Sequence, residues 1–250
     1  MDCRTVFKRY ELKYMLSKDE ARELVGAIEP YMKLDKYGKT TIRNVYFDND
    51  SYRLIRRSIE KPTYKEKLRV RSYAEATRES NIFVELKKKY EGVVYKRRVL
   101  MSEGEAMDWI CAGGRCPCDT QISREIDYFK SYFGPLKPTV FLSYDREAYY
   151  MRDGSDFRIT FDTDLLARAE ELSLTCTVHG EPLMDSDSVL MELKCMGGMP
   201  LWMAHILSRM KIYKTSFSKY GAAYKSIILS NICKQSLACS KEELIYGTII

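Results

Sequence analysis

The sequence predicts an α+β protein, and three observations lead to this class. Eight segments have the alternation, or the Val, Ile, Tyr and Phe content, that is typical of β-strands. Five further segments have apolar residues at helical spacing. Charged residues recur at every second position of the strands, which makes one face of the expected sheet too polar for an open sandwich.

The order of the predicted strands favours mostly antiparallel pairing. The fourth and fifth strands form a hairpin, because Gly92 supplies the turn between them. The eight segments are 7–16, 40–49, 64–73, 81–90, 92–101, 138–151, 157–165 and 188–196.

Helices interrupt the strands, and two of them have clear start signals. Ser17 and Glu20 have the spacing of a capping box, and Ser102 and Glu105 repeat it. The predicted helices are 17–32, 102–113, 123–134, 200–210 and 218–232. The first carries the apolar residues Ala21, Leu24, Val25, Ile28 and Met32 on one face. We expect such faces to cover the apolar side of the sheet.

Length and composition favour one soluble domain. The 250 residues are 45% hydrophobic and 30% charged, with a net charge of +6 and no internal repeat or low-complexity linker. We assign 1–233 to this domain and 234–250 to a tail or short helix. The charged N-terminus does not have a signal-peptide pattern, and no apolar stretch is long enough to span a membrane. We therefore expect a cytoplasmic protein.

Missing motifs exclude several enzyme classes. The sequence has neither a Walker loop nor a G-x-G-x-x-G motif, which argues against P-loop and Rossmann nucleotide sites. The two histidines, His179 and His205, do not lie near a plausible nucleophile, so a hydrolase triad is not expected. The cysteine cluster "CAGGRCPCD" lacks the paired spacing of a zinc site.

Basic residues dominate the polar strand faces. Alternate residues of a strand share a face, and the cations on these faces are Arg9, Lys13, Lys67, Arg69, Arg71, Lys87, Lys89, Arg146, Arg158 and Lys194. On a single strand this pattern is typical of the wet face of an antiparallel sheet. If the sheet closes into a barrel, close cations inside it repel one another by roughly 4 kcal/mol per pair. Such a tunnel requires water or a polyanion inside.

Phosphate is the ligand chemistry that this lining favours. Arg69 and Arg71, two positions apart, match phosphate oxygens by forked hydrogen bonds. Carboxylates among the cations suit a hard divalent cation, whose other ligands are phosphate oxygens. We therefore expect a phosphate chain with Mg²⁺ or Mn²⁺. Nucleic acid is not expected, because the sequence has no basic-aromatic platform motif and no helix-turn-helix pattern.

An ordered set of motifs resembles the VTC domain, the catalytic domain of the vacuolar transporter chaperone complex, within the CYTH or triphosphate tunnel metalloenzyme superfamily. The motifs are "FKRYELKY", "IRNVYFDN", "KLRVRSY", "FVELKKK", "SYDREAYY", "FRITFDTDL", "LMELK" and "FSKYGAAY", over about residues 5–230. The resemblance implies an eight-stranded antiparallel tunnel-like β-barrel with a basic interior and helices outside. It also implies a polyphosphate polymerase, which passes the γ-phosphoryl group of ATP to a growing phosphate chain with a divalent metal.

The resemblance also assigns roles to particular residues. Its phosphate-binding, catalytic basic residues fall on Lys13, Arg69, Arg71, Lys87, Arg146 and Arg158. Its metal-binding glutamate falls on Glu192, with Glu11 and Glu85 as auxiliary ligands or as partners of the lysines. The further candidate substrate contacts are Lys67, Lys89 and Lys194, on the same faces, and Lys219, in the family's F-S-K motif.

The chain departs from the wider superfamily at two places. The E-x-E-x-K motif begins with Arg9 here, which fits the VTC branch better than a two-metal triphosphatase. Ser216 stands where the polymerase branch often has a lysine, with Lys214 close by. Two alternatives therefore stay open: a triphosphatase or other nucleotide hydrolase with the same tunnel, and a non-catalytic module that binds polyphosphate, pyrophosphate or nucleotide. Any export of a product would need a membrane-protein partner.

Overall fold

The computed structural model describes residues 6–233, and their side chains from Tyr10 onward. The tail or short helix predicted at 234–250 lies outside the described residues. No helix in the described range is both long enough and apolar enough to cross a membrane.

Strands and helices alternate along the chain, with most helices short. The strands are β1 (Val6–Ser17), β2 (Met32–Leu34), β3 (Thr40–Asp48), β4 (Tyr64–Ser72), β5 (Asn81–Tyr90), β6 (Val93–Ser102), β7 (Lys137–Met151), β8 (Phe157–Arg168), β9 (Glu181–Pro182), β10 (Ser188–Cys195) and β11 (Lys214–Thr215). The helices are α1 (Lys18–Ile28), α2 (Arg53–Ile59), α3 (Glu103–Cys111), α4 (Gln121–Phe133), α5 (Leu201–Arg209) and α6 (Lys219–Ala223), which continues as a π-helical segment, Tyr224–Ile228.

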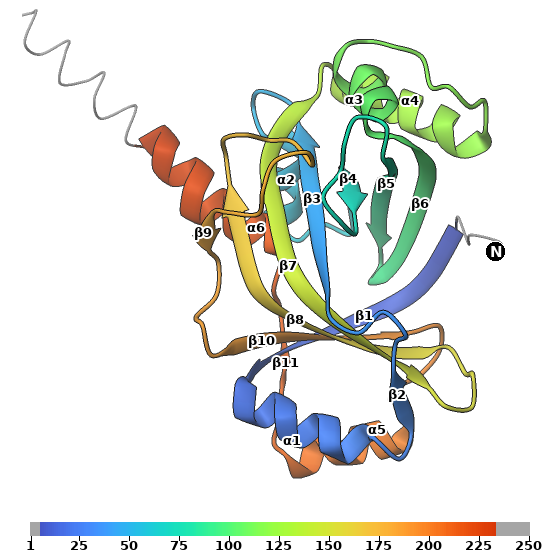
Figure 1. Ribbon diagram of the computed structural model, residues 1–250, viewed down its shortest axis with the longest axis vertical. Coiled ribbons are helices and arrows are strands. Elements are labelled where there is room, and N and C mark those ends of the chain that lie inside the picture. Colours follow the sequence, from blue (N-terminus) through green and yellow to red (C-terminus); the bar gives the residue numbers. More distant parts are fainter. Residues whose placement is uncertain (1–5, 234–250) are drawn as a thin grey trace, which may run out of the picture.

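All eleven strands found in residues 6–233 belong to one antiparallel sheet. Its order is β2-β7-β3-β4-β5-β6-β1-β10-β8-β9, with β11 on β1. In addition, β7 pairs with β8 as well as with β3. Each of the eight long strands therefore has two neighbours among the other seven. In Figure 1, β3 to β6 stand to the right of β7 in the upper part of the molecule, β8 runs along the left side of β7, and β1 and β10 cross below them.

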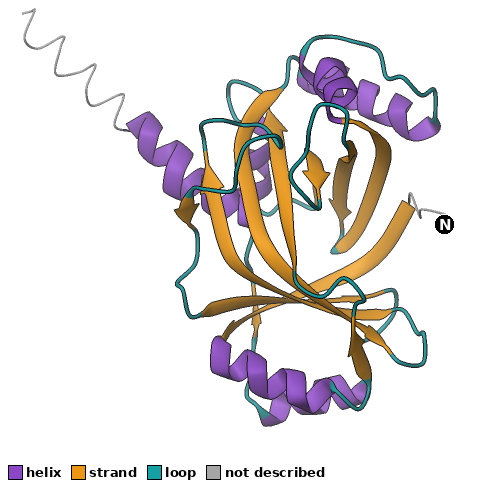
Figure 2. Ribbon diagram, viewed as in Figure 1, coloured by secondary structure: helices purple, strands orange, loops and turns teal. Residues whose placement is uncertain are grey.

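Two apolar clusters occupy the outer face of this sheet, and a third lies at one end of its inner face; each is covered by helices (Figure 2). Trp109 of α3 and Phe129 of α4 pack on β4, β5 and β6. Leu24 of α1 and Met203 of α5 cover β1, β8 and β10. Tyr220 of α6 packs on β3 and β7. Apart from this third cluster, the inner face of the curved sheet is left to the alternate, polar residues.

The predicted capping boxes of α1 and α3 are confirmed. The Ser17 Oγ accepts a hydrogen bond from the Glu20 amide at 3.1 Å, and a Glu20 carboxylate oxygen accepts from the Ser17 amide at 2.8 Å. Ser102 and Glu105 repeat both bonds, which satisfy otherwise unpaired N–H groups in the first helical turn.

The α+β class, the antiparallel sheet and the five predicted helices are confirmed, with four corrections. The sheet differs from an eight-stranded barrel because β2, β9 and β11, two or three residues each, lie outside the run of eight long strands. Met32, predicted on the first helix, lies in β2 and pairs with Met151. Helix α2 was not predicted, because Tyr52 at its N-cap makes no side-chain cap. The last predicted helix changes to π-helical geometry after Ala223.

Candidate functional site

One large cavity, of about 1100 Å³, lies on the inner face of the sheet. Its lining comes from β1, β3 to β8, β10 and the segment 214–220. On β4, the alternation predicted from the sequence is confirmed, since Arg69 and Arg71 line the cavity while Leu68 and Val70 are fully buried in the outer core. The period of two thus separates a charged interior from an apolar exterior.

The structure brings together all but one of the predicted site residues, while the side chain of Arg9 lies outside the described part of the chain. The cavity is lined by Glu11, Lys13, Lys67, Arg69, Arg71, Lys87, Lys89, Arg146, Arg158, Glu192, Lys194 and Lys219. Glu85 is the exception, because it is fully buried behind Arg69 and Arg71. Twelve groups from six strands and α6 therefore face one space.

Glu85 holds two of the cavity arginines in place. Its Oε2 atom accepts from the Arg69 Nε at 2.9 Å and Nη2 at 2.7 Å, and lies 3.8 Å from the Arg71 Nε. Its Oε1 atom accepts from the Lys96 Nζ at 3.2 Å. Burial alone would raise the pKa of Glu85, but Arg71 and Arg69 hold it well below its usual range. Both carboxylate oxygens are thus engaged by cations, and Glu85 positions the arginines.

Glu192 lies at the centre of a second cluster of cations. Its Oε1 atom is 3.3 Å from the Lys13 Nζ and 3.2 Å from the Lys219 Nζ. Its Oε2 atom is 2.9 Å from the Lys194 Nζ and 3.6 Å from an Arg146 Nη2. Burial would raise the pKa of Glu192, but Lys194 and Lys219 keep it well below its usual range. Strand register explains the contact with Lys13, since Lys13 and Glu192 are directly paired across β1 and β10.

Asp162, on β8, completes this cluster and was not among the predicted site residues. It accepts two hydrogen bonds from Arg146, each at 2.6 Å, and one from the Lys219 Nζ at 2.6 Å. Asp162 is fully buried, so it fixes Arg146 and Lys219 toward Glu192 as Glu85 fixes Arg69.

Glu11 faces the cavity from β1 with one cation. Its Oε2 atom is 2.6 Å from the Lys87 Nζ. Burial would raise the pKa of Glu11, but Lys87 overrides this and lowers it to about 2. Glu11 is thus ionised near neutral pH, as Glu192 is, and the two carboxylates interact electrostatically.

A divalent cation fits these residues only with ligands from a phosphate chain. The described residues contain no group of three or more His, Cys, Asp or Glu side chains placed to hold a metal. Glu192 and Glu11 are the acidic members of the predicted set that line the cavity. Since Mg²⁺ in proteins is often held by one or two carboxylates together with substrate phosphates, Glu192 and Glu11 are the residues that would hold it beside a bound phosphate chain.

A third group of cations lines one end of the cavity without carboxylate partners. We call Lys65, Lys67 and Lys89 the lysine entrance. None of the three has a carboxylate within 4.0 Å in the described part of the chain; the Lys67 Nζ donates to the Ser218 Oγ at 2.9 Å and the Lys65 Nζ to the Ser58 carbonyl at 3.2 Å. Burial lowers the pKa of Lys67 well below its usual range, and the Lys13 and Lys87 ammonium groups add to the shift.

Sequence reasoning missed several other lining residues, and some had a readable signal. Lys96 and Arg98 alternate on β6 and face the cavity, as their spacing of two allows. Tyr46 and Tyr144 had no such signal in the sequence. The Tyr46 hydroxyl accepts a hydrogen bond from the Arg69 Nη1 at 2.8 Å, and the Tyr144 hydroxyl accepts one from the Arg71 Nη2 at 3.1 Å. Ser216 lines the cavity, and so does Lys214 two residues before it.

Known structures share this fold at low sequence identity. A proposed adenylate cyclase from Bacillus halodurans is 16% identical, with a TM-score of 0.54 over 86% of this chain and 95% of that chain. A proposed adenylyl cyclase from Hippeastrum, described as having a dominant triphosphatase activity, is also 16% identical, with a TM-score of 0.53 over 87% of this chain and 95% of that chain. Comparison with curated protein sequences gives no match.

A family model described as the VTC domain matches residues 8–228, which is most of the chain. The match includes every predicted site residue, from Glu11 to Lys219. The resemblance read from the ordered motifs is thereby confirmed, and the chain belongs to the VTC domain family.

Proposed function

We propose that this protein is a polyphosphate polymerase, which transfers the γ-phosphoryl group of ATP to the end of a phosphate chain inside a triphosphate tunnel. The observation that carries the proposal is the cavity of about 1100 Å³ whose cations outnumber its carboxylates. Among the described residues, Lys65, Lys67 and Lys89 have no carboxylate within 4.0 Å, so a polyanion is the ligand that relieves their repulsion. Membership of the VTC domain family supports the same substrate class.

The residues of the chain act by positioning and by charge stabilisation. Phosphoryl transfer needs little covalent chemistry from a protein, so fixed cations around the transferred group suffice. Arg69 and Arg146 are held rigid by Glu85 and Asp162 and bind phosphate oxygens. Lys13 and Lys87 neutralise charge that develops at the reacting phosphorus.

The acceptor supplies the nucleophile. An oxygen of the chain-terminal phosphate forms a bond to the γ-phosphorus of ATP, and the bond from that phosphorus to the bridging oxygen breaks with its electron pair. The products are ADP and a chain longer by one phosphate, so no protein base is required. Mn²⁺ or Mg²⁺, held by Glu192 and Glu11 together with phosphate oxygens, supplies further charge neutralisation when bound.

A triphosphatase is the second candidate, because the Hippeastrum protein with this fold is described as having that activity. The same cations would then stabilise attack by water on the terminal phosphate. One assay separates the candidates: the purified protein is incubated with ATP and Mn²⁺, with and without EDTA. Long-chain polyphosphate supports the polymerase and free phosphate alone supports the triphosphatase. Binding of ATP without turnover indicates a non-catalytic module and contradicts both activities.

Lys13→Met tests the assignment of the cavity itself. Removal of a cation near the reacting phosphorus should lower turnover by about 100-fold. Lys225→Met, at an exposed position on the π-helical segment, is the matched control and should retain full turnover. Equal activity of the two variants would exclude the cavity as the site of the reaction.

A further inference from the structure

The cavity has two chemically different ends. Lys65 pairs with Lys89 across β4 and β5, while Arg71 pairs with Phe83 on the same two strands. The step of six residues from Lys65 to Arg71 covers about 20 Å of extended chain. The lysine entrance therefore lies at one end of the cavity, and Phe83 marks the other.

Tyrosines surround the end marked by Phe83. We call Tyr37, Tyr73 and Tyr150 the aromatic entrance, and all three line the cavity. Tyr73 follows the last residue of β4, Tyr37 lies in the loop before β3, and Tyr150 is near the end of β7. In antiparallel strands the end of β4, the start of β3 and the end of β7 meet at the same edge, so these rings share one end of the cavity.

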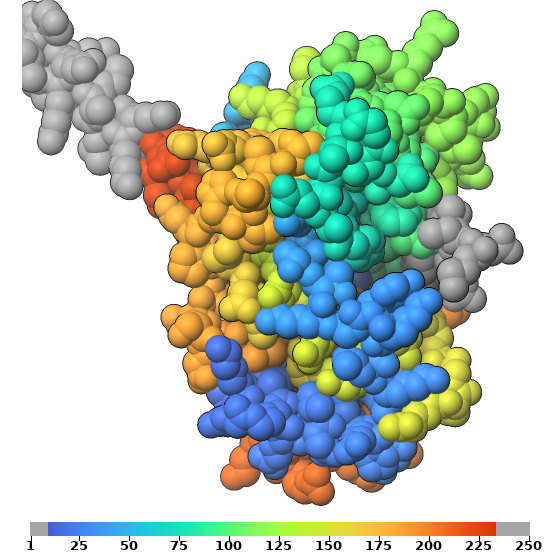
Figure 3. Space-filling view, viewed as in Figure 1, coloured from blue at the N-terminus to red at the C-terminus, as the bar shows by residue number. Residues whose placement is uncertain are grey.

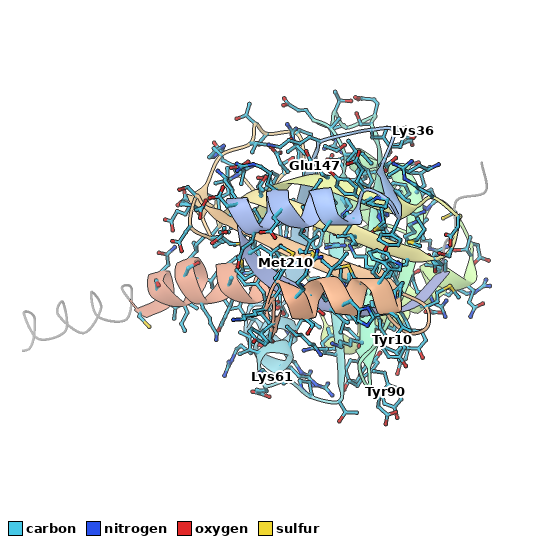
Figure 4. The ribbon with its side chains drawn as sticks, turned by 90° about the horizontal axis from the view of Figure 1, so that it is seen from below. Tyr10, Lys36, Lys61, Tyr90, Glu147 and Met210 are labelled. Carbon is cyan, nitrogen blue, oxygen red and sulfur yellow. The ribbon has the colours of Figure 1, made fainter. Side chains whose placement is uncertain are left out.

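The figures agree with this separation. Figure 4 shows Lys36, the neighbour of Tyr37, on one side of the molecule, and Lys61 and Tyr90, which flank the lysine entrance in sequence, on the opposite side. In the space-filling view, the blue atoms before β3 and the teal atoms after β4 lie on the face toward the viewer (Figure 3).

The rings of the aromatic entrance are accessible. Tyr37 is 67% exposed, Tyr73 45% and Tyr150 36%. The Tyr73 ring packs edge-on against Phe83, with centroids 6.0 Å apart. At the lysine end, by contrast, Phe217 and Tyr220 reach the cavity, and both pack in the apolar cluster on β3 and β7. Exposed aromatic faces on charged, water-filled cavities are available for stacking.

An arginine adjoins these rings with unused hydrogen-bonding capacity. The Arg158 guanidinium carbon lies 4.5 Å from the centroid of the Tyr150 ring. Its Nε atom is buried and has no hydrogen-bond partner within the part of the chain that the structure describes. Arg158 also has no ion pair within 4.0 Å among the described residues, unlike Arg69 and Arg146. A guanidinium group that lines the cavity beside an aromatic ring suits a phosphate that is attached to a ring system.

We propose that the aromatic entrance binds the base of a nucleoside triphosphate, with Arg158 on the phosphate nearest the nucleoside and the other phosphates extending into the cavity. The proposal rests on the proposed function, because a nucleotide must enter the cavity for it to hold. A phosphate chain has no rings to stack, so it occupies the lysine entrance. Stacking on tyrosine tolerates every base, and ATP and GTP should therefore bind with similar affinity.

Calorimetric titration with ATP and with inorganic tripolyphosphate tests the proposal, because the two ligands share the phosphates and differ in the nucleoside. Tyr37→Ala and Tyr150→Ala should each weaken ATP binding at least about fivefold, the lower end of base–aromatic stacking. The same variants should bind tripolyphosphate within about twofold of the unaltered protein. Tyr150→Phe should restore ATP binding, since stacking needs only the ring.

Tyr90→Ala is the matched control, because Tyr90 is 47% exposed and does not line the cavity. It should bind both ligands normally. Equal losses of ATP and tripolyphosphate in the tyrosine variants, or unchanged ATP binding, would overturn the nucleoside site while leaving the proposed function intact. Binding of neither ligand by the unaltered protein would refute the proposed function, and the nucleoside site with it. Circular dichroism verifies that each variant is folded.

Discussion

The cavity contains two kinds of cation. Some adjoin a buried acid and stabilise the fold, whereas others have no acid nearby and serve mainly in ligand binding. Arg69 and Arg71 adjoin the fully buried Glu85, and Arg146 and Lys219 adjoin the fully buried Asp162. The lysine entrance has no such acids within 4.0 Å in the described residues.

Neutralised cations are compatible with a stable empty cavity, whereas clustered lysines without acids are costly until a polyanion arrives. The acid-paired arginines thus belong to the architecture as well as to the site. The lysine entrance lowers the folding stability of the free protein. Its charges become favourable chiefly when a polyanionic ligand is bound.

Removal of Glu85 should have the largest effect on stability. Glu85→Ala leaves Arg69, Arg71 and Lys96 close together without their shared carboxylate, which should lower the free energy of unfolding by about 3–5 kcal/mol. Denaturant unfolding of the free protein measures this loss.

The control for that variant is Glu75→Ala, which removes an acid that is 55% exposed and pairs with Arg43. An exposed ion pair contributes at most about 1 kcal/mol. If Glu85→Ala lowered the free energy of unfolding no more than Glu75→Ala, the distinction between acid-paired cations and the lysine entrance would be wrong.

Lys67→Met should act in the opposite direction. It removes a half-buried ammonium group whose pKa is lowered by burial and by Lys13 and Lys87, so the free protein should gain up to about 1 kcal/mol of stability. Affinity for tripolyphosphate should fall about tenfold, because one charge-assisted contact is lost. Thermal unfolding and calorimetry measure the two effects, and a loss of both stability and affinity would contradict the distinction.

The smallest expected effect is a pH dependence that belongs to Lys96. Burial lowers the pKa of this lysine to about 8, from an ordinary value near 10.5. Folding therefore disfavours the ammonium form of Lys96. Between about pH 8 and 10.5 the unfolded chain binds more protons than the folded protein, so the free energy of unfolding increases as pH rises. Binding has the opposite sign, because only the charged form attracts phosphate.

Affinity for tripolyphosphate should thus fall about fivefold as pH rises from 7 to 9, since one such contact contributes ~1 kcal/mol. Lys96→Arg stays charged over this range and should remove the step. Lys194, whose pKa is lowered by burial to about 7, titrates at lower pH and gives a separate step. If the affinity for tripolyphosphate still changed near pH 8 in Lys96→Arg, the titrating group would be a residue other than Lys96.

The long strands and the charged inner face were predictable from the sequence because both follow from a local period of two. Predicted segments such as 81–90 and 138–151 match β5 and β7 within one residue. The same alternation placed Arg69 and Arg158 on the cavity side.

Features that depend on register between distant strands were not predictable. Asp162 was visible on a polar strand face, but its pairing with Arg146 and Lys219 depends on how β8 lies beside β7 and on where α6 begins. The two-residue strands β9 and β11 carry no periodic signal, and they form only because longer neighbours offer free edges.

The position of β1 has a consequence for how the protein is made. This strand lies between β6 and β10, so its second neighbour is synthesised long after it. At about 5–20 residues per second, β10 leaves the ribosome on the order of ten seconds or more after β1. Until then the Glu11–Lys13 segment of β1 lacks its pairing with β10. We expect folding to be slow and to finish only after release of β10, because most of its pairings join distant parts of the chain.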